Sequence, residues 1–170
     1  MTTTGYATID FLQWAPILVV LLFMLMFFGG SAGSTGGAIK IVRVWLIIKN
    51  SYLELKRIIH PNAVIPIRYN KRAIPEKITS NILNFVTLYM MIFITGSIVM
   101  SFFGLDLETA MGSVAASLGN IGPGIGSVGP ADNFAHLPQG GKWFLSMLML
   151  MGRLELFTVI VLFTPGYWKK

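Results

Sequence analysis

Residues 28–40 read Phe-Gly-Gly-Ser-Ala-Gly-Ser-Thr-Gly-Gly-Ala-Ile-Lys, and this stretch decides how the rest of the chain is arranged. It contains five glycines and three hydroxyl residues, and each glycine destabilises a helix by about 1 kcal/mol relative to alanine. We therefore expect a helix to break here. Apolar sequence flanks the stretch on both sides, and irregular backbone at membrane depth is tolerated only where it is buried in protein or lines a water-filled cavity. The stretch therefore indicates a permeation path.

The residues before this stretch predict a membrane-spanning helix. Residues 11–28 read FLQWAPILVVLLFMLMFF, carry no charge and would cover about 27 Å as a helix, close to the thickness of the hydrocarbon core. Pro16 lies in the first turns, where a missing N–H does least harm, and Trp14 is placed as an interfacial anchor. One span is therefore expected immediately before the glycine-rich stretch.

The residues after the stretch predict a helix that leaves the membrane. Residues 39–59 read IKIVRVWLIIKNSYLELKRII, with apolar residues at intervals of three and four and basic residues between them, which is typical of an amphipathic helix. Residues 60–75 contain three prolines and an Asn-Lys pair between β-favouring residues. We expect them to form a short cytoplasmic connection that includes a hairpin.

Two further spans, with a short helix between them, are predicted in the rest of the chain. Residues 81–103 are uncharged and would cover about 35 Å as a helix, enough to cross with tilt. Residues 106–118 would reach only about 20 Å, and Asp106 and Glu108 lie where the helix dipole favours anions, so a re-entrant helix is expected. The pattern is completed by a glycine-rich segment over residues 117–130, an extracellular loop over 131–142 and a last span over 143–167.

Composition indicates a membrane protein. Of 170 residues, 54% are hydrophobic and 12% are charged, about half the charged share of a soluble domain. Nine basic residues lie between residues 39 and 77, so the positive-inside rule places residues 39–77 and the C-terminus in the cytoplasm. The same rule explains the net charge of +6 more simply than nucleic-acid binding does.

No chemistry of an enzyme is indicated. Cysteine is absent, which excludes disulfides and Cys-ligated metal. No acid/base pair, nucleophile or metal cluster stands out in the sequence. His60 and His136 are isolated in predicted loops without metal-ligand spacing, so we expect them to be solvated.

A span, a short helix, a glycine loop and a second span form the architecture of a pore-loop repeat. In such a repeat, the backbone carbonyls of the extended segment replace part of the hydration shell of a cation. Glycine is needed there because positive φ angles or close approach to the ion exclude a Cβ. Residues 119–124, Gly-Asn-Ile-Gly-Pro-Gly, are positioned to be that segment. The alternative is an ordinary extracellular loop, because turns also favour glycine and proline.

Four motifs follow one another along the chain. They are residues 2–8 (Thr-Thr-Thr-Gly-Tyr-Ala-Thr), 29–40, 117–124 (Ser-Leu-Gly-Asn-Ile-Gly-Pro-Gly) and 152–158 (Gly-Arg-Leu-Glu-Leu-Phe-Thr). In this order they resemble the TrkH/KtrB/HKT superfamily of potassium transporters, and most closely its TrkH branch. The resemblance implies an all-α membrane protein with four fused pore-loop repeats around one K⁺ path, each made of span, re-entrant pore helix, filter and span, and with one broken transmembrane helix.

By this resemblance the chain is the C-terminal part of such a transporter. Residues 1–59 would hold the filter segment and the broken second helix of the third repeat, residues 60–77 a cytoplasmic linker, and residues 78–170 the fourth repeat. The implied filter residues are Thr3, Thr4, Gly5, Asn120, Ile121 and Gly122. K⁺ would bind at the backbone carbonyls of Thr4, Gly5, Asn120, Ile121 and Gly122.

The resemblance also implies a gate. The glycine-rich stretch is similar to the family's intramembrane loop, which restricts the pore below the filter, and Arg153 would project into the pore and cooperate with it. The gating residues are then Gly29, Gly30, Ser31, Gly33, Ser34, Thr35, Gly36, Gly37 and Arg153. Two alternatives stay open: the glycines spaced by four also fit a small-xxx-small helix-packing site, and the arginine also fits a structural role between helices.

The sequence therefore predicts potassium transport across the inner membrane by a multi-pass protein that is not an enzyme and has no cofactor besides the transported K⁺. The expected partners are membrane lipid, the missing N-terminal repeats, a second copy in a homodimer and, by family resemblance, a cytoplasmic nucleotide-binding regulatory subunit. Two alternatives are a non-conducting structural or regulatory fragment and a different secondary transporter with a broken helix at its substrate site.

Overall fold

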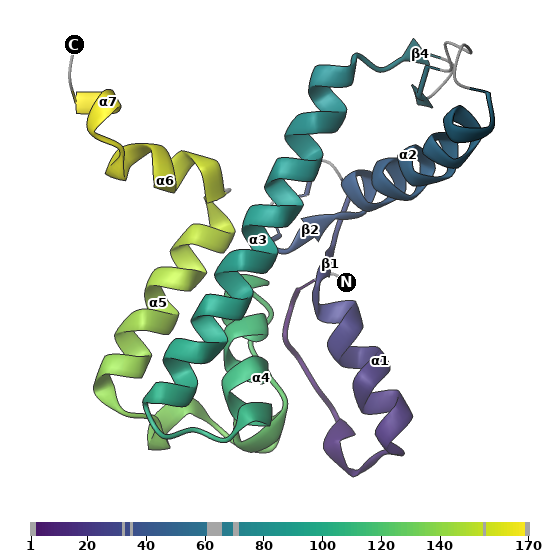
Figure 1. The fold of residues 1–170 in the computed structure, drawn as a ribbon. Helices are drawn as coiled ribbons and strands as arrows, with labels where there is room; N and C mark the ends of the chain where they lie inside the picture. The colour runs from purple at the N-terminus through teal and green to yellow at the C-terminus, as the bar shows by residue number, and fades with distance from the viewer. Residues whose placement is uncertain are drawn as a thin grey trace.

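The computed structural model describes residues 3–31, 33, 34, 36–60, 66–69, 72–154 and 156–168. The chain is predominantly helical, as predicted, and two pairs of two-residue strands lie between the helices (Figure 1). The helices are α1 (Pro16–Met26), α2 (Ile41–Ile59), α3 (Glu76–Phe102), α4 (Leu107–Leu118), α5 (Gln139–Arg153), α6 (Leu156–Phe163) and α7 (Pro165–Trp168). The strands are β1 (Phe28–Gly29), β2 (Ile39–Lys40), β3 (Arg68–Tyr69) and β4 (Arg72–Ala73), and short 3₁₀ turns are η1 (Phe11–Gln13), η2 (Gly126–Val128) and η3 (Phe134–His136).

Helix α1 is shorter than the predicted span. It begins at Pro16, because proline is favoured at the first helical position, and it ends at Met26, ahead of the glycines. Its 11 residues extend about 16 Å, roughly half of a hydrocarbon core. Residues 11–13 form the separate turn η1, whose N-cap Asp10 accepts a 3.0 Å hydrogen bond from the Leu12 N–H. The predicted helix over residues 11–28 is therefore wrong at its N-terminal end.

Helix α2 and the hairpin β3–β4 agree with the prediction for residues 39–75. The helix begins two residues later than expected, and β3 and β4 pair antiparallel with Arg68 opposite Ala73. Leu46 of α2 packs with Ile67 and Ile82 in a small separate core. This part of the molecule and α7 lie at the end opposite the α3–α4 connection (Figure 1). It is the end that the charge pattern assigns to the cytoplasm.

Helix α3 contains the predicted second span. Within the described residues it is the single unbroken helix that is long and apolar enough to cross a membrane. The chain then reverses at Gly104, whose φ of +88° is one that residues with a Cβ rarely adopt. This reversal leads directly into α4.

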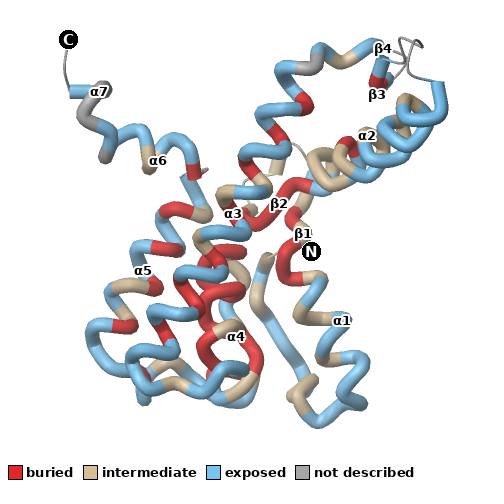
Figure 2. Tube along the Cα trace, in the orientation of Figure 1, coloured by how far each residue is buried: buried red, intermediate tan, exposed pale blue. Residues whose placement is uncertain are grey.

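Helix α4 lies at the centre of the buried core (Figure 2). Asp106 caps its N-terminus by accepting a 3.1 Å hydrogen bond from the Thr109 N–H. Most of the helix is buried, and many of its residues are Ala, Gly or Ser, which lets α3 and α5 pack closely on both sides. Its position, covered by other elements, fits a short helix that does not itself face lipid.

The last predicted span is divided in the structure. Helix α5 ends at Arg153, α6 begins at Leu156, and the two helices are bent by 114° at this break. Gly152 and the charged Arg153 interrupt the apolar sequence here, and glycine is a common cause of sharp kinks; Glu155 lies outside the described residues. The prediction of one continuous span over residues 143–167 is wrong, and Arg153 lies at the end of a helix and not within one.

Candidate permeation site

The two predicted filter segments lie against each other. Residues 3–7 run without helix or strand past the turn that follows α4. A Cβ added to Gly5 would lie 2.3 Å from the backbone carbonyl oxygen of Ile121, and one added to Gly122 would lie 3.7 Å from the Gly5 Cα. A backbone oxygen cannot rotate away as a side chain does, so only glycine fits at residue 5. The fold thus brings together two motifs that are far apart in the sequence.

Both segments have left-handed backbone. The φ angles are +54° at Thr3 and +76° at Gly5 in one segment, and +53° at Asn120 and +116° at Gly122 in the other. The left-handed conformation costs a residue with a Cβ about 1–2 kcal/mol, so the surrounding structure must hold Thr3 and Asn120 in it. Such strain clusters at functional sites.

The turn after α4 is fixed through its nitrogen atoms. The N–H groups of Gly119, Asn120 and Ile121 donate to carbonyls of the last turns of α4 at 2.9, 3.1 and 2.9 Å. The Asn120 side chain donates from Nδ2 to the Met149 carbonyl of α5 at 3.1 Å. Among the residues that the structure describes, no hydrogen bond is made to the carbonyl oxygens of Asn120, Ile121 or Gly122. The turn is therefore held to α4 and α5 through its nitrogen atoms.

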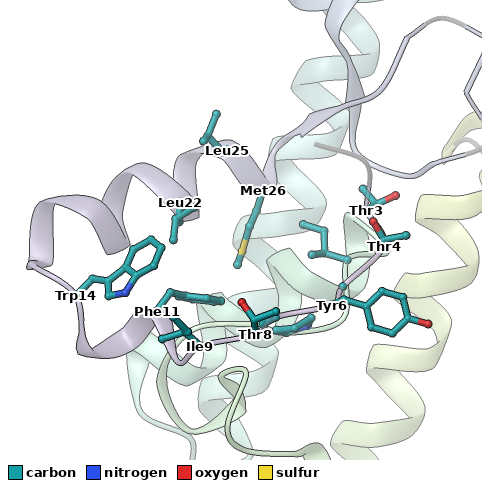
Figure 3. Close-up of a pocket in the computed structure, with 14 residues that line it drawn as sticks. Thr3, Thr4, Tyr6, Thr8, Ile9, Phe11, Trp14, Leu22, Leu25 and Met26 are labelled. Atoms are coloured by element: carbon teal, nitrogen blue, oxygen red, sulfur yellow. The ribbon is translucent and has the colours of Figure 1, made fainter.

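A cavity of about 420 Å³ lies beside the first segment (Figure 3). Thr3, Thr4 and Thr8 line it on one side, and Leu22 and Met26 of α1 line it on the other. In the close-up, Met26 points toward the segment, whereas Tyr6 points away from α1. The segment is thus accessible along the side that faces α1.

The glycine-rich stretch forms a closed loop. Its ends meet in the parallel pair β1–β2, with Phe28 opposite Ile39 and Gly29 opposite Lys40. The Ile39 N–H donates to the Phe27 carbonyl at 3.0 Å, and the Ile41 N–H donates to the Gly30 carbonyl at 3.2 Å. The described residues between Phe27 and Lys40 include no helix, so the helix-packing alternative is wrong. Thr35, one of the predicted gating residues, lies outside the described residues.

The loop contacts both predicted filter segments. A Cβ added to Gly36 would lie 2.9 Å from the Thr3 Oγ1, and one added to Gly37 would lie 2.5 Å from the carbonyl oxygen of Gly119. At Gly33, by contrast, an added Cβ would meet nothing within 4 Å. One edge of the loop is therefore pressed against the segments, and the tip around Gly33 has open space.

Arg153 lies beside this loop. A cavity of about 90 Å³ is lined by residues of the loop and its stem, of α2 and α3, and of the end of α5, namely Ser34, Gly36, Ala38, Lys40, Arg43, Phe85, Gly152 and Arg153. Gly152 allows α5 to approach, because a Cβ there would lie 2.0 Å from the Leu118 carbonyl oxygen. The predicted gating arginine and the predicted gating loop therefore share one small cavity.

Two further cations in this cavity were not predicted as site residues. The Arg43 guanidinium lies 4.1 Å from the centre of the Phe85 ring. The Lys40 side chain is buried, and its Nζ donates to the carbonyls of Ser34 and, at 2.8 Å, of Gly36. The sequence held a signal for Lys40: a cation at the start of a helix is disfavoured by the helix dipole and so needs a local partner.

A chain of hydrogen bonds ties η2 to the start of α4. Thr109 donates from Oγ1 to Asp106 Oδ2 at 3.1 Å, and its Oγ1 lies 3.1 Å from Ser127 Oγ. Ser127 Oγ in turn lies 3.0 Å from His136 Nε2. Because the single Thr109 hydroxyl proton goes to the carboxylate, the Ser127 hydroxyl must donate to Thr109, and His136 Nε2 must donate to Ser127. His136 was predicted to be solvated; it is exposed, yet it ends this chain.

The same hydrogen bonds stabilise the ionised form of the Asp106 side chain. The hydrogen bonds from the Thr109 backbone N–H and then from the Thr109 hydroxyl lower the pKa of the Asp106 carboxyl. A carboxylate is therefore favoured at the N-terminus of α4, where the helix dipole also stabilises negative charge.

Comparison with known proteins covers the whole chain. The family model described as "TrkH: Cation transport protein" matches residues 1–170. The chain belongs to the TrkH family. The Trk system potassium uptake protein TrkH of Salmonella typhimurium is 45% identical over 169 residues, which are 99% of this chain and 35% of that protein. TrkI of Halomonas elongata is 40% identical over 171 residues, which are 100% of this chain and 35% of that protein.

A solved structure of this family has the same fold. The crystal structure of the potassium transporter TrkH from Vibrio parahaemolyticus matches with a TM-score of 0.90 and 39% sequence identity, over 99% of this chain and 36% of that one. The predicted family is therefore confirmed. The chain spans about a third of the length of the curated TrkH-family relatives it matches, in keeping with the C-terminal portion that the motifs imply. These relatives are named as potassium uptake proteins, not as enzymes.

Proposed function

We propose that this chain is the C-terminal part of a TrkH-type potassium uptake subunit of the inner membrane. Residues 1–59 supply the filter segment and the broken second helix of the third pore-loop repeat, residues 60–77 link the repeats in the cytoplasm, and residues 78–170 form the fourth repeat. The first two repeats supply the remaining two filter segments.

The contact between the two left-handed segments carries this proposal. K⁺ binds at the backbone carbonyls of Thr4, Gly5, Asn120, Ile121 and Gly122. Two features support the assignment: the close approach of Gly5 to Ile121 and the positive φ angles in both segments. Carbonyl oxygens arranged in this way replace the hydration shell of a monovalent cation.

The loop over residues 29–37 and Arg153 form the gate of the proposed pore. The loop is pressed against Thr3 and Gly119, and the arginine shares a cavity with it. In this position the loop obstructs ions that leave the filter, and it must move for conduction. A guanidinium beside the path adds electrostatic repulsion against K⁺.

The exposed surfaces fit the proposed setting. Lys49, Lys56 and Arg57 of α2 and Arg68 of the hairpin belong to the part assigned to the cytoplasm, where a nucleotide-binding regulatory subunit binds. Many large apolar side chains of α1, α3 and α6 are exposed in this chain, and lipid, the missing repeats and a second copy cover them in the assembled dimer.

Substitution of Gly122 by serine in the complete transporter tests the filter. A side chain at φ +116° distorts the turn, so discrimination of K⁺ over Na⁺ should weaken in flux measurements. Gly104→Ala is the matched control, because Gly104 also has positive φ, lies in open space and is outside the proposed filter. Unchanged K⁺ selectivity in Gly122→Ser, or an equal loss of selectivity in both variants, would refute the filter assignment.

The alternative of a non-conducting fragment is tested by complementation. K⁺-uptake-deficient cells should grow at low K⁺ when they express the chain together with its upstream region. Growth with the upstream region, and none without it, supports a pore shared between the two parts. No growth in either case favours a structural or regulatory role.

A further inference from the structure

The Lys40 side chain folds back across the loop that it follows. Lys40 lies at the N-cap of α2 and in β2, opposite Gly29, and it is 9% exposed. Its Nζ reaches the carbonyls of Ser34, six residues earlier, and of Gly36, four residues earlier. The backbone of Lys40 thus closes the loop at its stem, while the side chain of the same residue crosses its interior.

The recorded partners of this ammonium are carbonyl oxygens. A buried charge is stable only where it is paired or hydrogen-bonded, and bonds from an ionised donor are roughly twice as strong as neutral ones. Two backbone carbonyls that converge on one buried cation form a cation site of their own. That site lies on the loop and apart from the two filter segments.

We infer that the loop contains a binding site for a primary ammonium, that Lys40 occupies this site as a tethered cation, and that this occupancy sets the shape of the loop. The site itself does not depend on the proposed function; its consequence for gating does. Lys40 is in this sense a positioning residue, since its Nζ bonds carbonyls of the loop and none of the carbonyls proposed to bind K⁺.

Other hydrogen bonds of the loop are local. Within its described residues, the Ser34 N–H donates to the Ser31 carbonyl at 2.9 Å, and the Gly36 N–H donates to Ser34 Oγ at 3.1 Å. Both bonds are local, whereas the two bonds from Lys40 connect the far side of the loop to its stem. Loss of the ammonium should therefore loosen residues 33–37 and leave β1–β2 intact.

A loosened loop changes its contacts with the filter segments. Gly36 and Gly37 lie against Thr3 and Gly119, and the Gly36 carbonyl also accepts a hydrogen bond from Lys40. The ammonium thus fixes where the loop meets both segments. Arg153, in the same cavity, is held beside a loop of fixed shape.

Loop mobility in the complete transporter tests the inference. The chain has no cysteine, so Gly33→Cys provides a unique spin-label position within it, at a site where a Cβ meets nothing within 4 Å. Lys40→Ala should raise the mobile fraction of the nitroxide spectrum several-fold. Lys49→Ala is the matched control, because Lys49 also donates to a backbone carbonyl, that of Arg68 at 2.5 Å, but on the hairpin. Its spectrum should match the parent.

Chemical rescue distinguishes a cation site from simple packing. Lys40→Ala removes three carbons and the ammonium, which n-propylammonium replaces atom for atom, whereas 1-propanol fills the same space without charge. Propylammonium should restore the immobile spectrum, and propanol should not. An unchanged spectrum in Lys40→Ala, rescue by both molecules, or rescue by neither overturns the inference.

A second variant keeps the test independent of folding. If Lys40→Ala does not assemble, Lys40→Met retains most of the side-chain volume and should still raise the mobile fraction; an immobile loop in Lys40→Met overturns the inference. Rb⁺ flux through the same proteins separates the two proposals. A mobile loop with unchanged flux refutes the gate and leaves the ammonium site standing, whereas an immobile loop refutes the site whatever the flux.

Discussion

Residues 29–37 and residues 119–129 each contain five glycines, yet the structure holds the two segments in different ways. The second segment is packed through its backbone: a Cβ on Gly112 of α4 would lie 2.5 Å from the Ile125 carbonyl oxygen, and the Gly124 N–H donates to the Val128 carbonyl at 2.8 Å. The first segment is closed at its stem and crossed by one lysine, and its tip has open space.

Glycine content therefore does not by itself predict mobility. In residues 119–129 the missing Cβ atoms allow backbone to touch backbone, which fixes the segment. In residues 29–37 the backbone is packed closely at Gly29, Gly36 and Gly37, whereas a Cβ at Gly33 would meet nothing within 4 Å. A rigid segment suits a filter, whose oxygens must keep their places, and a tethered loop suits a gate.

Among the substitutions that test this difference between the two segments, Gly112→Ala should have the largest effect, which is a loss of stability. Its Cβ would overlap backbone atoms of Ile125 that cannot swing away, which costs about 2 kcal/mol or more and exceeds the roughly 1 kcal/mol gained in helix propensity. Thermal unfolding of the complete transporter should show a clear fall in the midpoint. Gly33→Ala should leave the midpoint unchanged or slightly raised. Equal losses at both positions would show that the loop tip is packed as tightly as the turn.

Arg153→Ala should raise K⁺ flux if the arginine helps the loop to close the pore. Loss of one charge-assisted contact is worth roughly 1.5–3 kcal/mol, so an increase on the order of tenfold is expected. Lys142→Ala is the control, since Lys142 is also basic and also on α5, but at its opposite end. Isotope uptake at saturating K⁺ is the measurement. Unaltered flux in Arg153→Ala would count against the gating role.

Ser127→Ala should loosen the rigid segment by a smaller amount. It removes the hydroxyl that joins Thr109 to His136, at a cost of about 1 kcal/mol. Hydrogen exchange should rise in residues 124–129 and stay constant in residues 29–37. Ser146→Ala, which removes a hydroxyl bonded only within α5 among the described residues, serves as the control. NMR of His136 should also show the proton on Nε2, and a proton on Nδ1 alone would contradict the deduced direction of the chain.

Ionisation of Asp106 should have the smallest effect on stability, and this effect should appear only at acidic pH. Hydrogen bonds lower its pKa in the folded protein, so its contribution to stability is fully present above the unfolded pKa of about 3.9. This contribution to stability is lost as the pH falls through the lowered pKa that Asp106 has in the folded protein. The side chain is exposed, so solvent screening keeps the effect small. Asp106→Asn retains a capping oxygen and should flatten the acid limb of the stability curve; an unchanged limb would place the titrating group elsewhere.

Local patterns in the sequence predict much of the fold. The periodicity of residues 39–59, the apolar run over 81–103 and the acidic start of 106–118 correspond to α2, α3 and α4, because each pattern acts within one element. The start of α1 was missed because Pro16 was read as tolerated inside a helix, when it begins one. The break after Arg153 was missed because the apolar character of residues 156–163 hides it.

The candidate site depends on contacts that no single segment displays. Gly5 and Gly122 were named through a family motif, but their mutual approach depends on the packing of the whole chain. The Lys40 side chain bonds a carbonyl across its loop, and Ser127 bonds His136 of another turn. Nothing in these residue types distinguishes them in the sequence. A sequence pattern records which side chains are present, whereas their partners are set by tertiary structure.

The two-residue stem β1–β2 also has a mechanical consequence. It joins the start of α2 directly to the base of the loop, and α2 is a stiff rod of 19 residues, about 28 Å long. A force applied at the Ile59 end therefore rotates α2 about the stem. Because the far end lies about 28 Å from the stem, a swing of several ångströms there becomes a rotation of roughly ten degrees at Lys40, which moves the base of the loop by much less.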